Sequence, residues 1–236
     1  MKAIILAAGI GNRLKPITEN IPKVMIKING IPLIGHQIKN LIEKGIKEIY
    51  ICVGYKKEII IDYCKKEFKN IDIKFIKNKD FLSTNNMYSL YLAKNYFNGE
   101  NFILINGDMI FDKKILDICL KNNGKSIAFY DSMDFNETEP RIKLKDNEAQ
   151  SLVLPKIKEE TNGRTIGTFL FNKESSEKLL EDMKFFIEKE KKSNEIFELS
   201  VNNIFNKTKF DSINVKGIKW AEIDNFDDLK KAESIF

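Results

Sequence analysis

The chain has 236 residues, of which 43% are hydrophobic and 31% charged, and this composition supports a substantial core within one α/β domain. No apolar run approaches the roughly 18 residues of a membrane span, so we expect no membrane association. The formal net charge is only +5, with lysines mixed among glutamates rather than gathered in a basic stripe, which argues against nucleic-acid binding.

The first predicted element is a buried strand over residues 3–6. It runs into small residues and glycines, where the backbone can turn sharply and approach a ligand closely. Successive N–H groups in such a turn form a concave site for anions, and two basic side chains flank it. A phosphate-binding loop is therefore predicted, the alternative being an ordinary structural turn. The residues assigned to this loop are Leu6, Ala7, Ala8, Gly9, Gly11, Asn12, Arg13 and Lys23.

The glycine spacing of this loop fits neither of two common phosphate motifs. Gly9-x-Gly11 lacks the third glycine of a dinucleotide fingerprint, and no Gly-Lys-Ser/Thr closes it as a P-loop. The complete string over residues 6–23 is Leu-Ala-Ala-Gly-x-Gly-x-Arg-Leu-x-Pro-x-Thr-x-x-x-Pro-Lys. It resembles the signature of nucleotidyltransferases that activate sugar phosphates and phosphorylated small alcohols with a nucleoside triphosphate.

Helices and strands alternate up to about residue 130, which predicts a doubly wound parallel sheet. Ligands of such sheets bind beyond the carboxyl ends of the strands, where the opening loop lies. Asp108 directly follows the predicted strand 102–105 and is well placed to hold Mg²⁺, with a simple Asx turn as the alternative. The other predicted strands are 49–53, 71–76 and 126–130, and the helices are 32–44, 56–66, 87–96 and 113–121.

A polar segment precedes the predicted helix 87–96. One asparagine there would suffice to cap the helix. Two adjacent asparagines after two hydroxyl residues exceed what a cap requires, and their polar groups suit the Watson–Crick edge of a base. We therefore assign this segment to the nucleotide site. Its residues are Ser83, Thr84, Asn85 and Asn86.

The pattern changes at residue 131. Short alternating segments at 141–145, 150–154 and 165–171 predict an antiparallel lid or insertion over the second substrate. Charged helices at 174–191 and 195–206 and a strand at 210–215 follow.

The last part of the chain alternates over residues 220–224, which places Glu222 and Asp224 on one face of a strand before a helix at 226–235. The predicted fold class is α/β, a Rossmann-like doubly wound mixed sheet with this small lid. We expect one domain over 1–236. It divides into a nucleotide-binding core (1–130), an acceptor-binding lid and helices (131–210), and a metal-binding strand with a closing helix (211–236).

Three widely spaced cysteines, Cys52, Cys64 and Cys119, form no C-x-x-C pair. They lie in apolar or helical patterns, so we expect buried free thiols in a reducing cytoplasm. The short apolar run after Lys2 is followed at once by basic residues such as Arg13, which excludes a secretory signal.

Several later positions extend the family resemblance over most of the chain. Together with the opening signature they resemble the small single-domain cytidylyltransferases typified by the phosphocholine enzyme of bacterial surface-polysaccharide pathways. Sugar nucleotidyltransferases usually carry a Gln-x-x-Pro-x-Gly-Leu-Ala type of segment at residues 83–86, so the difference favours the cytidylyl branch. The matching positions are Asn85-Asn86-x-Tyr88-Ser89-Leu90, Gly107-Asp108, Gly163-x-x-x-Gly167 and Trp220-x-Glu222-x-Asp224.

The resemblance implies that an acceptor phosphate oxygen attacks the α-phosphorus of CTP in line and that pyrophosphate leaves. No protein nucleophile is needed, and the protein positions two anions and neutralises their charge. Arg13 and Lys23 are the implied catalytic residues, the first on the β- and γ-phosphates and the second near the α-phosphate. Asp108 and Asp224 are the implied ligands of a Mg²⁺ cofactor.

The acceptor is expected to meet residues of the lid and of the last strand. Glu222 is either a third metal ligand or a contact to a cationic acceptor group. Arg164 stands where choline-type enzymes are expected to carry an acid, and Arg141 lies in the same lid, so both suit a carboxylate unless they serve surface solubility. L-glutamine phosphate and a phosphocholine-like amino alcohol phosphate are the two candidate acceptors, for capsule or surface polysaccharide decoration. The predicted acceptor-binding residues are Arg141, Arg164, Gly167, Glu195, Trp220 and Glu222.

Two other functions are compatible with the sequence. One is a uridylyl- or thymidylyltransferase acting on a sugar 1-phosphate, and the other is an inactive nucleotide-binding regulatory module. We expect the protein to act as a monomer or homodimer.

Overall fold

The computed structural model describes residues 1–155 and 157–236, and its centre is a nine-stranded mixed sheet. The strands are β1 (Lys2–Ala7), β4 (Glu48–Val53), β5 (Ile73–Lys77), β6 (Phe102–Asn106), β8 (Ile127–Asp131), β9 (Arg141–Lys145), β10 (Glu148–Val153), β11 (Gly163–Phe171) and β12 (Asp211–Asn214). Their order across the sheet is β5-β4-β1-β6-β11-β8-β12-β10-β9.

The N-terminal half of the sheet is parallel, as predicted. Strand β1 lies between β4 and β6 and pairs in parallel with both, and β5 continues the same direction at the edge. Strands covered on both faces need apolar side chains at successive positions. The run Ala3-Ile4-Ile5-Leu6 meets this need, because its members are buried alternately in the two layers of core.

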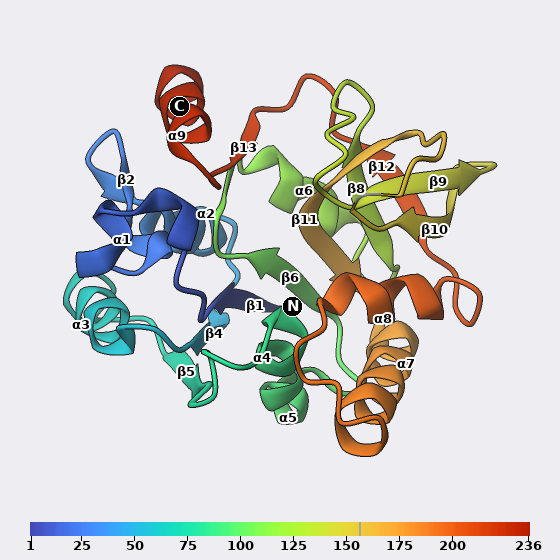
Figure 1. Ribbon diagram of the computed structural model, residues 1–236, viewed down its shortest axis with the longest axis horizontal. Coiled ribbons are helices and arrows are strands. Elements are labelled where there is room, and N and C mark those ends of the chain that lie inside the picture. The colour runs from blue at the N-terminus through green and yellow to red at the C-terminus, as the bar shows by residue number, and fades with distance from the viewer. Residues whose placement is uncertain (156) are drawn as a thin grey trace.

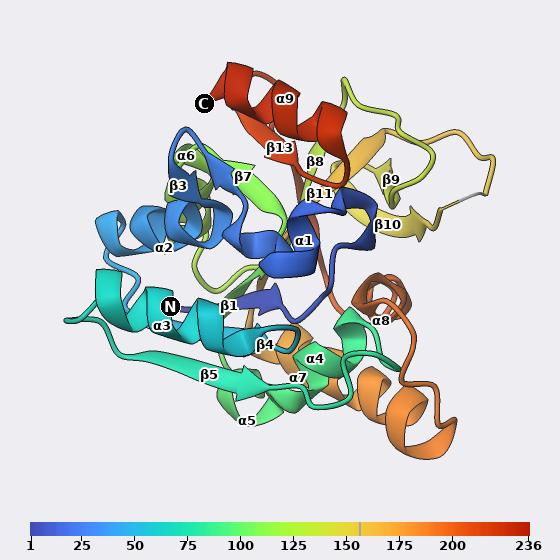
Figure 2. The ribbon, with the colours of Figure 1, turned by 60° about the vertical axis from the view of Figure 1, so that its left-hand side comes forward.

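Helices cover both faces of the sheet (Figures 1 and 2). One face packs against α2 (Leu33–Glu43), α3 (Lys57–Glu67) and α6 (Lys114–Lys121). The other packs against α4 (Asn86–Leu92), α5 (Lys94–Phe97), α7 (Lys173–Lys184) and α8 (Phe197–Ile204). The predicted doubly wound α/β class is confirmed.

Strand β11 is a correction to the predicted lid. It lies inside the main sheet, antiparallel to both β6 and β8, and all nine of its residues are buried. The buried polar residues Arg164, Thr165 and Thr168 interrupt its apolar pattern, so its sequence resembles that of a half-exposed strand. The predicted antiparallel hairpin itself is present as β9 and β10 at the far end of the sheet.

Two of the predicted helices are not continuous α-helices in the structure. The expected helix 87–96 divides at Ala93 into α4 and α5. The expected helix 174–191 is α-helical only to Lys184, and a π-helical turn, Phe185–Lys189, continues it.

A smaller assembly closes one side of the molecule. Strand β7 (Met109–Phe111), which is too short to be recognised in the sequence, pairs antiparallel with β13 (Trp220–Glu222). The hairpin of β2 (Lys27–Ile28) and β3 (Ile31–Pro32) and the helix α9 (Phe226–Ile235) lie beside it (Figure 1). A separate apolar cluster joins these elements to the opening segment. Its buried members are Leu14, Ile26, Ile28, Leu33, Ile110, Ala221, Ile223 and Ala232.

The cysteines agree with the sequence prediction, since Cys52, Cys64 and Cys119 are all buried and free. Among the helices of residues 1–155 and 157–236, none is both long and apolar enough to cross a membrane.

Candidate active site

The opening loop leaves β1 and turns through Gly11, whose φ of +75° lies in the left-handed region. A Cβ at this position would lie 2.8 Å from the Cβ of Lys23, so glycine satisfies both the backbone and the space. The hydroxyl of Thr18 donates to the Gly11 carbonyl at 2.9 Å and fixes the turn. The two basic residues of the loop, Arg13 and Lys23, reach the same carboxylate, Asp224.

Lys23 lies at the centre of a charged cluster that also contains Arg13, Asp108 and Asp224. Its Nζ is 2.7 Å from Oδ2 of Asp108 and 2.6 Å from Oδ1 of Asp224, and its side chain is 13% exposed. Burial by itself lowers the pKa of Lys23, but the charges of the two aspartates and their hydrogen bonds outweigh it and hold that pKa above its ordinary value. Lys23 is therefore a cationic ammonium held between two carboxylates.

Arg13 approaches the same cluster from solvent. Its Nη2 is 2.7 Å from Oδ1 of Asp224, while its side chain is 65% exposed. Burial raises the pKa of Asp224, but Lys23 and Arg13 outweigh it and bring that pKa below its ordinary value. Asp224 is thus an anion, and Arg13 is the more accessible of its two cationic partners.

The two aspartates are positioned by backbone bonds between distant segments. The N–H of Gly107 donates to the Leu6 carbonyl at 3.0 Å, and a Cβ on this glycine would lie 2.4 Å from that oxygen. The N–H of Ile223 donates to the Asp108 carbonyl at 3.0 Å. The turn after β6 is therefore joined to β1 on one side and to the segment after β13 on the other.

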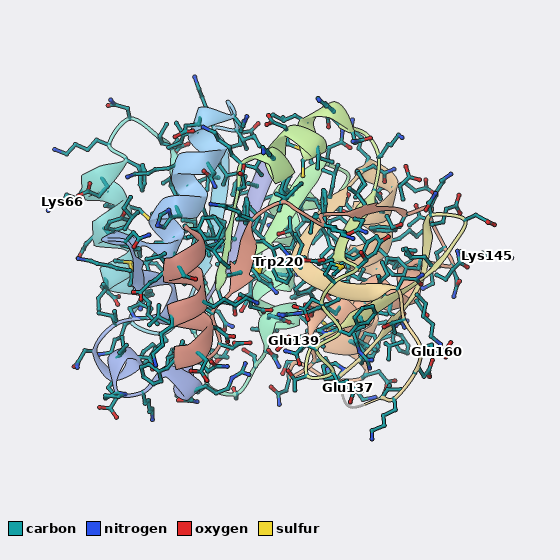
Figure 3. All side chains as sticks on the ribbon, turned by 90° about the horizontal axis from the view of Figure 1, so that it is seen from above. Lys66, Glu137, Glu139, Lys145, Glu160 and Trp220 are labelled. Carbon is teal, nitrogen blue, oxygen red and sulfur yellow. The ribbon has the colours of Figure 1, made fainter. Side chains whose placement is uncertain are left out.

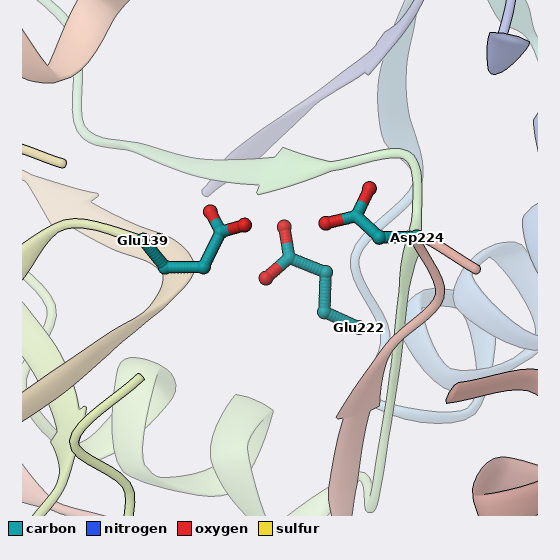
Figure 4. A group of neighbouring side chains, drawn as sticks. All are labelled: Glu139, Glu222 and Asp224. Carbon is teal, nitrogen blue, oxygen red and sulfur yellow. The ribbon is translucent and has the colours of Figure 1, made fainter. Parts of the chain in front are cut away.

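Two further carboxylates face Asp224. Glu139, Glu222 and Asp224 each offer an oxygen within 4.8 Å of the others (Figure 4). Glu222 forms an ion pair with Arg164, which also contacts Asp134 at 3.1 Å. Burial, followed by the charge of Asp108, raises the pKa of Glu222 well above its ordinary value, and burial raises the pKa of Glu139 to about 7.

Glu139 was not predicted from the sequence. It comes from the loop between β8 and β9 and turns inward, whereas its neighbour Glu137 is exposed (Figure 3). The sequence alone cannot distinguish these two glutamates, because neither has a distinctive spacing to other acidic residues. Their difference depends on the conformation of the loop.

The cluster fits a divalent cation. Carboxylate oxygens are the ligands that Mg²⁺ prefers, and no donor among residues 1–155 and 157–236 reaches Oδ1 of Asp108, which is buried. Five acidic side chains and three cations meet around the cluster, and the pKa values of two of the acids, Glu139 and Glu222, are raised. The carboxylates are Asp108, Asp134, Glu139, Glu222 and Asp224, and the cations are Arg13, Lys23 and Arg164.

A cavity of about 210 Å³ opens beside the cluster, at the carboxyl ends of β1 and β6. Its wall is polar on the side of α4. The lining residues are Leu6, Ala8, Gly9, Asn78, Phe81, Thr84, Asn85, Asn86, Ser89, Asn106, Gly107 and Asp108.

The four residues of the polar segment before α4 differ in their contacts and in whether they line the cavity. Asn85 caps this helix by accepting from the Asn86 N–H at 2.8 Å, and Asn86 accepts from the Phe197 N–H at 2.8 Å. Thr84 also lines the cavity, whereas Ser83 is exposed and its hydroxyl donates to the Asp80 carbonyl. That these residues read a base stays a prediction.

Asn78 is a cavity residue that sequence reasoning missed. Its side-chain amide donates at 3.0 Å to the hydroxyls of both Thr84 and Ser89. It thereby orders the polar wall. No motif marks Asn78, because its partners come from the loop and helix that follow.

A second cavity, of about 510 Å³, is lined by the charged cluster itself and adjoins the first cavity, with which it shares Gly9, Asn85, Asn86, Asn106 and Asp108. Glu198 of α8 lines it with a side chain that is buried, and its Oε2 meets no donor among the described residues. Burial raises the pKa of Glu198 to about 7. Sequence reasoning missed this residue, since a glutamate in a charged helix ordinarily faces solvent.

A family model described as Nucleotidyl transferase matches residues 2–235. The chain belongs to the nucleotidyl transferase family. The predicted membership is confirmed.

Curated proteins that resemble the chain include a cytidylyltransferase. The chain is 51% identical over 94 residues to a choline-phosphate cytidylyltransferase of Streptococcus pneumoniae, covering 40% of this chain and 39% of that protein. It is 30% identical over 231 residues to a bifunctional IPC transferase and DIPP synthase of Aquifex aeolicus, covering 98% of this chain and 50% of the relative. The chain spans between 29% and 50% of the length of the curated relatives it matches.

Solved structures agree with this membership. The CTP:phosphocholine cytidylyltransferase of Streptococcus pneumoniae superposes with a TM-score of 0.81 at 27% identity, over 99% of this chain and 98% of that one. An inositol-1-phosphate CTP transferase of T. maritima shares the fold, with a TM-score of 0.80 at 18% identity, over 99% and 94% of the two chains.

The arginines predicted to bind the acceptor have partners within the nucleotidyl transferase domain. The guanidinium of Arg141 is 4% exposed and donates to the carbonyls of Ile157 and Glu159, so it supports that segment. Arg164 pairs with Asp134 and Glu222, and its guanidinium lies 5.2 Å from the Trp220 ring.

The other predicted acceptor residues are dispersed. Trp220 donates from Nε1 to Asp131 at 2.9 Å and lies toward the middle of the molecule (Figure 3). Gly167 has a φ of +65° and adjoins Asn106, and the Glu195 carbonyl accepts from the backbone of α4. Of this set, the structure brings Arg164 and Glu222 to the charged cluster.

Proposed function

We propose that this chain transfers CMP from CTP to a small phosphorylated acceptor that carries an ammonium group, releasing pyrophosphate. The observation that carries the proposal is the buried Lys23, held between Asp108 and Asp224 beside a polar cavity at the carboxyl ends of β1 and β6. A cation held between two carboxylates can exchange the carboxylate oxygens for the oxygens of a bound phosphate.

Phosphate oxygens would draw Lys23 away from the aspartates. Its ammonium would then lie against the α-phosphate and the incoming acceptor phosphate, where negative charge gathers in the transition state. Arg13, which is mostly exposed, would hold the β- and γ-phosphates with its planar fork. Asp108 and Asp224 would then be free to hold Mg²⁺, which would offset the negative charge of the phosphates.

The choice of CTP rests on the comparisons and on the cavity wall. A choline-phosphate cytidylyltransferase is 51% identical over 94 residues, and a CTP:phosphocholine cytidylyltransferase superposes over nearly the full chain. Thr84 and Asn85 offer a hydroxyl and an amide at the cavity where the base would lie. We assign them, with Ser83 and Asn86, to the nucleotide-binding segment.

The acceptor is inferred from the charge of the second cavity. Glu198 and Glu139 line it, and the two cations that line it, Arg13 and Lys23, are paired with aspartates. Arg164 and Arg141 lie outside this lining; the first is paired with two carboxylates and the second is bonded to backbone carbonyls. An ammonium group satisfies an unpaired buried carboxylate, whereas a free carboxylate would be repelled. A phosphocholine-like amino alcohol phosphate fits this charge. L-glutamine phosphate offers an α-ammonium as well, but its α-carboxylate makes it the less favoured of the two acceptors.

We place this activity in the cytoplasm, in the supply of a CDP-linked group for surface or capsule polysaccharide. A uridylyltransferase that acts on a sugar 1-phosphate is the second candidate. It is favoured by 34% identity over 118 residues to the UTP–glucose-1-phosphate uridylyltransferase AglF of Haloferax volcanii, a match that covers 50% of this chain and 47% of that protein.

The test is a matrix of nucleotides and acceptors read by pyrophosphate release, with and without Mg²⁺. CTP, UTP, dTTP, GTP and ATP are each combined with phosphocholine, phosphoethanolamine, L-glutamine phosphate and sugar 1-phosphates. We expect turnover with CTP and an ammonium-bearing acceptor only when Mg²⁺ is present. Turnover with UTP and a sugar phosphate would overturn the cytidylyl proposal, and tight nucleotide binding without turnover would indicate a regulatory module.

A further inference from the structure

The turn that carries Asp108 is fastened by a single buried side chain from another layer of the fold. Gln37 lies on α2, is 1% exposed, and directs its Nε2 toward the backbone between β6 and β7. Helix α2 packs beside β7 (Figure 2). Gln37 therefore reaches from the helical layer to the edge of the active site.

Three carbonyls that flank Asp108 in sequence converge on this one nitrogen. The distances from Nε2 of Gln37 are 2.9 Å to the Asn106 oxygen, 3.3 Å to that of Gly107 and 2.7 Å to that of Met109. A side-chain amide has two N–H donors, so two of these bonds are full and the third is shared. Three acceptors around one position also fix the orientation of the amide, because its oxygen would be repelled there.

The oxygen atom of the Gln37 amide is not bonded as its nitrogen atom is. No donor among residues 1–155 and 157–236 reaches Oε1 of Gln37, which is buried. A buried acceptor without a partner destabilises the folded protein. The two N–H donors that the Gln37 amide places beside Asp108 are the feature that offsets the cost of its unpaired oxygen.

We propose that Gln37 is a positioning residue, which sets the orientation of Asp108 toward a divalent cation by fixing the backbone on both sides of it. The inference rests on the proposed function, because that function assigns Asp108 to the metal. Gln37 touches neither substrate nor metal in this arrangement. It acts through the peptide units before and after Asp108, whose Oδ1 is left available.

The same helix offers a matched control. Asn40 donates from its side-chain amide to the Phe111 carbonyl at 2.8 Å, so it makes the same kind of bond to the same short strand. Its partner lies three residues beyond Asp108 rather than beside it. A general effect on the contact between α2 and β7 would appear equally in variants of Asn40 and Gln37.

The experiment compares Gln37→Met with Asn40→Leu by direct Mn²⁺ binding, measured by electron paramagnetic resonance without nucleotide and with CTP. We expect Gln37→Met to weaken Mn²⁺ binding by about 10-fold to 100-fold, the range for residues that orient metal ligands. In steady-state assays the KM for Mg²⁺ should rise, while kcat at saturating Mg²⁺ largely recovers. Asn40→Leu should leave both quantities near those of the unchanged protein.

Unchanged Mn²⁺ affinity in Gln37→Met, or equal weakening in Asn40→Leu, would overturn the proposal. Gln37→Glu, which keeps the side-chain size and replaces donors by acceptors, is the second variant if Gln37→Met fails to fold. The binding measurement separates the two hypotheses. Mn²⁺ binding that depends on Gln37 in a protein that never turns over CTP supports the role of Gln37 and refutes the proposed function.

Discussion

Replacing Lys23 by methionine is the sharpest test of the charged cluster. The substitution removes the ammonium from between Asp108 and Asp224, at 2.7 Å and 2.6 Å. Methionine keeps a flexible unbranched stem, so the packing against the Cα of Gly11 is largely retained. The effect to be measured is therefore mainly that of the lost charge.

The expected cost is a reduction of the unfolding free energy by about 3 kcal/mol. Removing one partner of a buried ion pair costs roughly 3–5 kcal/mol. We expect the lower end, because the Asp108 side chain is 23% exposed and Asp224 retains Arg13. Transfer should also slow by a factor of about 100 to 1,000, the range for losing one preorganised donor to the transition state.

The pH dependence of this cost follows from the two pKa shifts. The pKa of Lys23 is raised, so its contribution is complete below the unfolded value of about 10.4 and is lost as pH rises through the folded value. The pKa of Asp224 is lowered, so its contribution is complete above about 3.9 and is lost as pH falls through the folded value. The difference between the two proteins should thus be constant around neutral pH.

Urea unfolding near neutral pH, with and without excess Mg²⁺, is the assay. We expect Mg²⁺ to stabilise Lys23→Met more than the unchanged protein, because the cation takes the place of the lost ammonium between two carboxylates. A loss below about 0.5 kcal/mol, the size of an ordinary surface substitution, would refute the reasoning. Equal stabilisation by Mg²⁺ in both proteins would refute the assignment of the aspartates.

Three further substitutions test other parts of the site. Glu198→Gln should flatten the pH dependence of stability, because a native pKa of about 7 against about 4.3 unfolded makes the unfolding free energy fall as pH rises between them; an unchanged urea series over that range would contradict this. The same variant should raise the KM of an ammonium-bearing acceptor and leave that of CTP unchanged. Gly107→Ala should lower stability by about 1–3 kcal/mol, since its Cβ would lie 2.4 Å from the Leu6 carbonyl oxygen; a thermal melt like that of the unchanged protein would argue against such crowding. Arg164→Met should destabilise the protein increasingly as pH rises, because Arg164 lowers the pKa of the buried Glu222 and its loss makes that carboxyl harder to ionise; a cost independent of pH would show that lost packing dominates.

The parallel half of the fold could be predicted because its strands are continuous apolar runs. The buried run at Ala3–Ile5 and the helix signals around it leave few arrangements other than a doubly wound sheet. Strand β11 could not be placed in the same way. Neighbouring strands cover Arg164 and Thr168, so these polar residues are buried. The alternation of polar and apolar residues in this strand therefore does not indicate which side chains are exposed.

The candidate site was predictable to the extent that it follows strand ends. Lys23, Asp108 and Asp224 were assigned to one site, and the structure brings them together. Glu198 and Gln37 could not be found, because what distinguishes them is created by tertiary contacts. Gln37, for example, lies 69 residues from the first carbonyl that it binds.

The pairing of β7 with β13 has a consequence for the order in which a growing chain acquires its parts. Every strand of the nine-stranded sheet has been synthesised once residue 214 has been added, yet Asp224 comes later and lies 201 residues from Lys23. Until then Lys23 lacks one of the two carboxylates that hold it in the folded protein, and Arg13 lacks the carboxylate with which it pairs. A nascent chain can therefore form the cavity at the ends of β1 and β6 before it completes the charged cluster beside it.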